Sequence, residues 1–143
     1  MYHFILKSKP LSYNSCTTKK RVNYKKALQE SFTTYNTTHT VLSGELYALV
    51  YYFFKKNLYL DTDNISKPVW DCLNGFLFTD DQQIKMRTAG SFDLTNGDFT
   101  VIDVTGLDGK LAGDLLDAFG SEDHIVYVEC GKFNPSMFKF SLE

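Results

Sequence analysis

Acidic residues gather in the middle of the chain, in a stretch that could bind a metal ion. Five aspartates fall within 21 positions: Asp61, Asp63, Asp71, Asp80 and Asp81. If the segment after the aromatic run 45–56 is extended, Asp61 and Asp63 point to the same side, because side chains alternate along a strand. Like charges held together destabilise a fold unless a cation lies between them. This spacing therefore predicts a site for a hard metal ion.

The residue types favour magnesium and phosphodiester hydrolysis. Mg²⁺ takes oxygen ligands, often one or two carboxylates with waters and phosphate, so we expect it at Asp61, Asp63 and Asp81. A bound metal lowers the pKa of a water and polarises a phosphoryl oxygen. Lys67 is the candidate ammonium that offsets charge building on the phosphate. On a predicted helix, Lys67 and Asp71 are four residues apart and lie off its apolar stripe.

The acidic stretch has two other interpretations, a calcium-binding loop and a solvated loop. A calcium loop requires an oxygen ligand at its fifth position and glycine at its sixth, where this chain has Ile65 and Ser66. The calcium loop is therefore disfavoured. Acidic composition alone is more typical of a solvated loop, and only an ordered pattern of further residues outweighs that interpretation.

Such an ordered pattern is present. It reads DxDN, then K, then D and LNG, then DD followed by Q and an apolar residue, and its residues are Asp61, Asp63, Asn64, Lys67, Asp71, Leu73, Asn74, Gly75, Asp80, Asp81, Gln83 and Ile84. In this pattern and its spacing, the chain resembles the RusA family of Holliday junction resolvases. The resemblance is clear over residues 58–88. Residues 57–60 depart from it, being apolar where the family often has proline or arginine.

The resemblance implies a homodimer that cuts symmetrically opposed strands of four-way DNA junctions with Mg²⁺ or Mn²⁺. It implies metal binding by Asp61, Asp63 and Asp81, catalytic assistance by Lys67, and supporting roles for Asp71 and Asp80. Two alternatives stay open. One is a non-catalytic protein that binds junctions, and the other is a nuclease of the same fold that acts on flaps, forks or a phage substrate.

A basic segment near the N-terminus is the candidate DNA-binding surface. The net charge is only −2, so contact with phosphates requires a local cluster. Such a cluster occurs on a predicted amphipathic helix over residues 19–32, and consists of Lys19, Lys20, Arg21, Lys25 and Lys26. A solvated helix face is the competing interpretation. Asn14 joins the candidate DNA-binding residues because the loop 9–14 resembles a loop of the family.

The remaining pattern predicts the elements that must position these residues. We expect strands over 2–8, 45–56, 84–88, 99–104 and 124–129, with 45–56 as an inner strand covered on both faces. Helices are expected over 19–32, 65–73 and 111–119, and a loop or helix end over 33–40. The helix over 65–73 should begin near Ser66, which would place Pro68 in its first turn.

Together these elements predict an α+β fold, with a small mixed β-sheet packed against two or three helices, as in RusA. At 143 residues, one domain over 1–143 is expected. No apolar run is long enough to cross a bilayer, so we expect a cytoplasmic protein without a membrane partner.

Overall fold

The computed structural model describes residues 1–95 and 102–142, and its centre is a four-stranded mixed sheet. The strands are β1 (Tyr2–Leu6), β2 (Leu46–Phe54), β3 (Ile84–Asp93) and β4 (His124–Lys132). They lie in the order β1-β4-β2-β3, with β4 antiparallel to both neighbours and β2 parallel to β3. The expected mixed sheet is confirmed.

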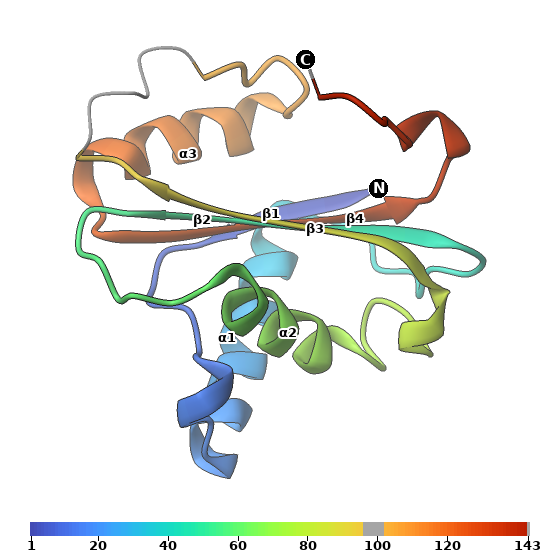
Figure 1. Cartoon of the computed structure of the whole chain (residues 1–143), viewed down its shortest axis with the longest axis horizontal. Coiled ribbons are helices and arrows are strands. Elements are labelled where there is room, and N and C mark those ends of the chain that lie inside the picture. The colour runs from blue at the N-terminus through green and yellow to red at the C-terminus, as the bar shows by residue number, and fades with distance from the viewer. Residues whose placement is uncertain (96–101, 143) are drawn as a thin grey trace.

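Helices cover both faces of the sheet, as Figure 1 shows. α1 (Thr18–Tyr35) and α2 (Thr62–Leu73) pack on one face, and α3 (Gly109–Ser121) lies on the other. The described residues also form three short 3-10 helices: η1 (Tyr13–Ser15), η2 (Asp81–Gln83) and η3 (Pro135–Met137). The α+β class and the three helices agree with the sequence. None of the described helices is both long and apolar enough to cross a membrane.

Strand β2 is the inner strand that its sequence predicts. Ala48, Val50 and Tyr52 pack into the core beneath α1 and α2, whereas Phe53 packs into the core beneath α3. This alternation follows from the two-residue period of a strand. Because both faces of β2 are covered, nearly all of its side chains are apolar, as in other buried strands.

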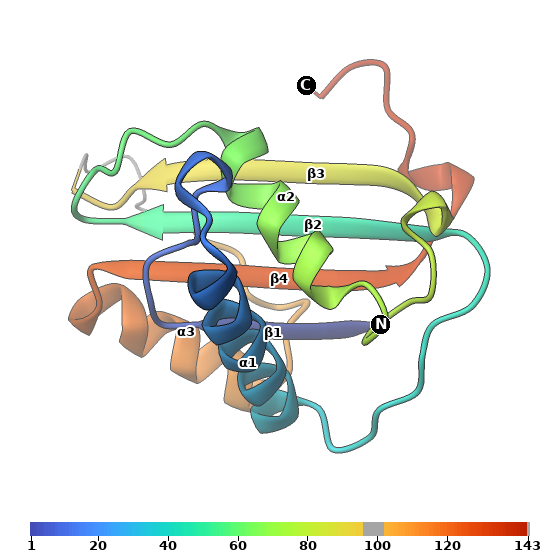
Figure 2. The ribbon, with the colours of Figure 1, turned by 90° about the horizontal axis from the view of Figure 1, so that it is seen from below.

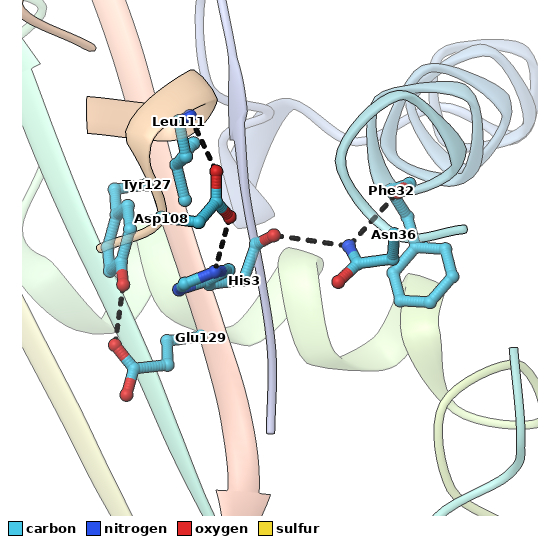
Figure 3. A network of polar contacts seen from close by, with 7 residues as sticks. All are labelled: His3, Phe32, Asn36, Asp108, Leu111, Tyr127 and Glu129. Atoms are coloured by element: carbon cyan, nitrogen blue, oxygen red, sulfur yellow. Dashed lines mark hydrogen bonds and ion pairs between the residues drawn. The ribbon is translucent and has the colours of Figure 1, made fainter. Parts of the chain in front are cut away.

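Polar contacts tie the N-terminal strand to helices on both sides of the sheet (Figure 3). The Asp108 carboxylate accepts a 3.0 Å hydrogen bond from His3 Nε2 and a 2.9 Å bond from the Leu111 amide, capping α3. On the opposite side, Asn36 Nδ2 donates to the carbonyls of His3 and Phe32 at 3.1 and 3.0 Å. These bonds fix β1 between α1 and α3.

Some expected boundaries were wrong. β3 continues five residues past Thr88, to Asp93. The strand expected over 99–104 falls partly outside the described residues, and 102–104 are not in a strand. α2 begins at Thr62 rather than near Ser66, because the Asp61 side chain caps it by accepting from the Asn64 amide at 2.8 Å. Pro68 therefore lies inside α2, where its ring nitrogen cannot donate to the Asn64 carbonyl.

Candidate active site

Asp61 and Asp63 lie at the start of α2, not along an extended segment at the end of a strand. Asp61 is the N-cap and Asp63 is in the first turn, and both are exposed. Carboxylates here are favoured because the helix N-terminus carries partial positive charge. The expectation that strand alternation points the pair to one side is wrong, since the chain has already turned into a helix at Thr62.

The Asp61 and Asp63 carboxylates differ in their contacts with the rest of the protein. One Asp61 oxygen accepts the Asn64 amide, which leaves the other oxygen for a ligand. The Asp63 side chain is 91% exposed, and its Oδ1 lies 4.0 Å from Arg87 Nη2 on β3. Arg87 offsets part of the negative charge without enclosing the carboxylate. Both aspartates can therefore offer oxygen ligands to a cation from solvent.

Lys67 and Arg21 share one carboxylate, that of Asp71. The distances to Asp71 Oδ2 are 3.2 Å from Lys67 Nζ and 3.3 Å from Arg21 Nη2. Lys67 Nζ also lies 5.4 Å from the centre of the Tyr13 ring, within the range of a cation–π contact. Two cations and one carboxylate leave a net charge of +1 between α1 and α2. This cluster suits a phosphate group.

An open cavity of about 240 Å³ lies beside this cluster, lined by Tyr13, Cys16, Arg21, Pro68 and Asp71. The neighbouring Cys72 is buried, and burial raises the pKa of its thiol above the usual value. Its Sγ lies 3.9 Å from the Arg21 carbonyl, to which it donates. A raised pKa favours the protonated thiol, and Cys72 belongs to the core beneath α1 and α2, so we interpret it as a packing residue.

The predicted basic residues are all exposed on or beside α1. They are Lys19, Lys20, Arg21, Lys25 and Lys26, and Asn14 is exposed in η1. Cations in the first turn of a helix oppose its dipole, and α1 has no acidic residue there to compensate. Helix stability therefore does not explain Lys19, Lys20 and Arg21.

Asp80 and Asp81 lie in a separate part of the molecule, at the start of β3. Asp80 caps η2 by accepting from the Gln82 amide at 2.8 Å, and Asp81 is exposed in the first position of η2. Gln83 explains the glutamine of the motif: its oxygen accepts from the Thr79 and Asp80 amides, and its nitrogen donates to the carbonyls of residues 42 and 44. Sequence reasoning did not anticipate this structural role.

The structure therefore brings together some of the predicted site and separates the rest. Lys67, Asp71 and Arg21 meet, and Asp61 and Asp63 lie at the start of the same α2. Asp81 is in η2, which follows the other end of α2 and leads into the start of β3. Figure 2 shows α2 crossing the sheet between these two places. Among the described residues, no three acidic, histidine or cysteine side chains are grouped closely enough to hold a metal ion. Two carboxylates with waters and phosphate still suit Mg²⁺.

Comparison with known proteins agrees with the residue pattern. A family model described as endodeoxyribonuclease RusA matches residues 7–102, which span α1, β2, α2 and β3. The match covers more than half of the chain and ends before α3 and β4. No curated protein matches the chain significantly. The chain belongs to the RusA endodeoxyribonuclease family.

Proposed function

We propose that this protein is a Mg²⁺-dependent endonuclease that resolves four-way DNA junctions by paired nicks. The observation that carries the proposal is the position of Asp61 and Asp63 at the exposed start of α2. On the same helix, Asp71 forms ion pairs with Lys67 and with Arg21 of the basic helix α1. Metal-binding carboxylates and phosphate-binding cations thus occur on one pair of packed helices. Family membership supports the choice of DNA as substrate.

Asp61 and Asp63 would hold the metal, whereas Asp81, the third predicted ligand, lies beyond the other end of α2. Mg²⁺ is the expected ion, and Mn²⁺ is the expected substitute. When bound, the ion would polarise a phosphoryl oxygen and lower the pKa of a water. The protein's own part is to present oxygen ligands on a rigid helix whose first turn is fixed by the Asp61 cap.

Lys67 and the α1 cations have separate tasks. The Lys67 ammonium is oriented by Asp71 and the Tyr13 ring, so it can donate to a phosphate oxygen as negative charge builds there. Arg21 and Lys25 are four residues apart on α1 and therefore share one side of the helix. They would bind backbone phosphates of the neighbouring strand, which positions the DNA without reading its sequence.

A homodimer suits this substrate. A four-way junction has two-fold symmetry, so a two-fold enzyme can place one active site on each of two equivalent strands. Selectivity would then depend on junction shape and on the spacing of the two sites.

Cleavage of a labelled synthetic four-way junction tests the proposal, with and without Mg²⁺ and with Asp63→Asn. We expect paired, Mg²⁺-dependent nicks, and a loss of at least about 100-fold in Asp63→Asn with junction binding retained. Asp117→Asn, an exposed aspartate on α3, is the matched control and should cleave like the wild type. Binding without nicks would indicate a non-catalytic junction protein, and cleavage confined to flaps or duplex would indicate another nuclease.

A further inference from the structure

A second cavity lies on the face of the sheet that carries α3, away from the candidate active site. Its volume is about 460 Å³, and it lies between β2, β3, β4, the segment 102–107 and α3. Figure 1 shows the sheet between α3 and the helices α1 and α2, so the cavity has no part in the proposed cleavage. Small-molecule sites are commonly of this size, mostly apolar, with a few polar groups that orient the ligand.

Aromatic rings form much of the cavity wall. The Tyr51 ring stacks on that of Tyr127, with centres 6.1 Å apart, and meets Phe92 edge to face at 5.5 Å. Gly90 lies opposite Tyr51 on β3, and a Cβ there would lie 2.5 Å from the Phe92 ring. Glycine inside a strand costs stability, so its presence at this position fits the close approach of that ring. Such rings attract cations through their negative faces.

The polar group of the cavity is the Glu129 carboxylate on β4. Tyr47 donates to its Oε1 and Tyr127 to its Oε2, both at 2.5 Å. The Tyr47 ring lies within 2.9 Å of where a Cβ of Gly131 would be, which lets its hydroxyl reach Glu129. Burial, and then the bond to Glu129, raise the pKa of both phenols, so they stay protonated donors. The two tyrosines therefore hold the carboxylate in one position.

The Glu129 charge has no counter-ion within the part of the chain that the structure describes. None of the Lys, Arg and His side chains there forms an ion pair with it. Each carboxylate oxygen can still accept a further bond beside its tyrosine hydrogen bond. A half-buried charge on a largely buried strand is unfavourable unless it is paired.

The chemistry of the lining selects the class of ligand. Its charged residues among those described are Glu129 and Asp103, both acidic, which disfavours an anion. A hydrated metal ion would gain nothing from apolar rings, because hard cations prefer oxygen ligands and water. An organic ammonium ion suits both parts of the lining, since its nitrogen donates to a carboxylate and its carbon chain packs on aromatic rings.

We propose that this cavity binds an organic ammonium ion, with its nitrogen at Glu129 and its alkyl chain against Tyr51, Phe92 and Tyr127. Free polyamines and lysine side chains of a partner protein both offer this group, and n-butylammonium reproduces it. The inference does not depend on the proposed nuclease function, because the cavity and the candidate active site lie on opposite faces of the sheet.

Titration of the full-length protein with n-butylammonium, followed by its amide NMR signals, tests the site. We expect saturable shifts of the Tyr51 and Glu129 signals. Glu129→Gln keeps the side-chain volume and an oxygen for the tyrosine hydroxyls, and should weaken binding by at least about tenfold. Asp117→Asn, an exposed aspartate on α3, is the matched control and should bind like the wild type. Equal binding by Glu129→Gln and wild type would overturn the proposal.

Two further comparisons keep the test decisive. Asp63→Asn should bind n-butylammonium like the wild type, whereas loss of binding there would place the ion at the acidic start of α2 and refute the cavity. If Glu129→Gln fails to fold, n-butanol replaces it as the test, because it has the same shape without the charge. It should bind the wild type at least about tenfold more weakly than n-butylammonium, and equal binding would refute a site for cations.

The source of the ammonium group is identified by comparing spermidine with Nα-acetyl-lysine amide. Tighter binding of spermidine indicates a free polyamine, and tighter binding of the lysine derivative indicates a partner protein. Saturable binding of either supports the site, and failure of both to shift the Tyr51 and Glu129 signals would overturn it. Glu129→Gln should still cleave a four-way junction at the wild-type rate, so an inactive wild type would refute the nuclease function without affecting this site.

Discussion

The Asp71 carboxylate pairs with two cations for which we propose different tasks. It contacts both Lys67 on its own helix and Arg21 on α1, at nearly equal distances. Its side chain is 27% exposed, so these ion pairs contribute little to stability. Their value lies in fixing the position of two positive groups beside an open cavity. We therefore expect substitutions of Arg21 and of Lys67 to affect different steps, the first DNA binding and the second cleavage.

Arg21→Gln should weaken junction binding and leave kcat nearly unchanged. The slope of log binding constant against log salt should fall by about 1, because one phosphate contact is lost. Lys67→Gln should instead lower kcat by about 100-fold with little change in binding. Binding titrations at several salt concentrations and single-turnover cleavage measure both quantities. Lys110→Gln on α3 is the control and should change neither binding nor kcat. If Arg21→Gln and Lys67→Gln affected binding and kcat equally, separate roles would be contradicted.

Asp108 provides a pH-dependent contribution to stability. The Leu111 amide, and then His3, lower the pKa of its carboxyl. A lowered folded pKa means that the stabilisation is complete above the unfolded value of about 3.9 and is lost as the pH falls through the folded value. Asp108→Ala removes this helix cap and should cost about 1 kcal/mol at pH 7.

Urea unfolding at pH 7 and at pH 2.5 checks this expectation. The difference in unfolding free energy between wild type and Asp108→Ala should shrink at the lower pH. Asp117→Ala, an exposed aspartate of the same helix, should show no comparable loss at either pH. A difference that stays constant between the two pH values would mean that the carboxylate charge is not what stabilises α3.

At the scale of elements, the packing of α1 against the rest of the fold depends on one aromatic residue, Phe32. Phe32 is 1% exposed, and its ring contacts Tyr2, Phe4, His39 and Phe76 edge to face. It thereby joins α1 to β1 and to the turn after α2. Phe32→Ala should lower the unfolding free energy by about 3–5 kcal/mol, measured by urea titration. Val22→Ala on the exposed side of α1 is the control, and a comparable loss there would argue against this packing.

Much of the element order could be predicted from residue patterns, because burial imposes a period on each helix and strand. β2 illustrates this, since its apolar run follows from cover on both faces. α2 shows the limit: the pattern places Asp61 at the end of an extended segment, although aspartate is also one of the favoured residues at a helix N-cap. The separation of Asp63 from Asp81 depends on where α2 begins and which way it crosses the sheet. The start of α2 is set locally by the Asp61 cap, whereas its direction across the sheet is not local in sequence.

At the scale of the whole molecule, the last strand completes the sheet. β4 lies between β1 and β2, so it joins the N-terminal strand to the rest of the sheet. Removing residues 124–143 should abolish cooperative unfolding, because β1 would lose the strand that it pairs with. Removing only 139–143, where Phe140 and Leu142 are exposed, should leave the unfolding midpoint nearly unchanged. Circular dichroism during heating distinguishes the two truncated proteins. A cooperatively folded 1–123 fragment would show that β4 is not needed to hold the sheet together.

The central place of β4 also bears on how the protein is made. During synthesis, α1, β2, α2 and β3 leave the ribosome before β4, so the gap between β1 and β2 stays open until Lys132 has emerged. Until then, helices α1 and α2, which carry the acidic and basic residues of the candidate active site, pack on an incomplete sheet. A nascent chain would therefore complete the sheet that carries this candidate site only once β4 has emerged.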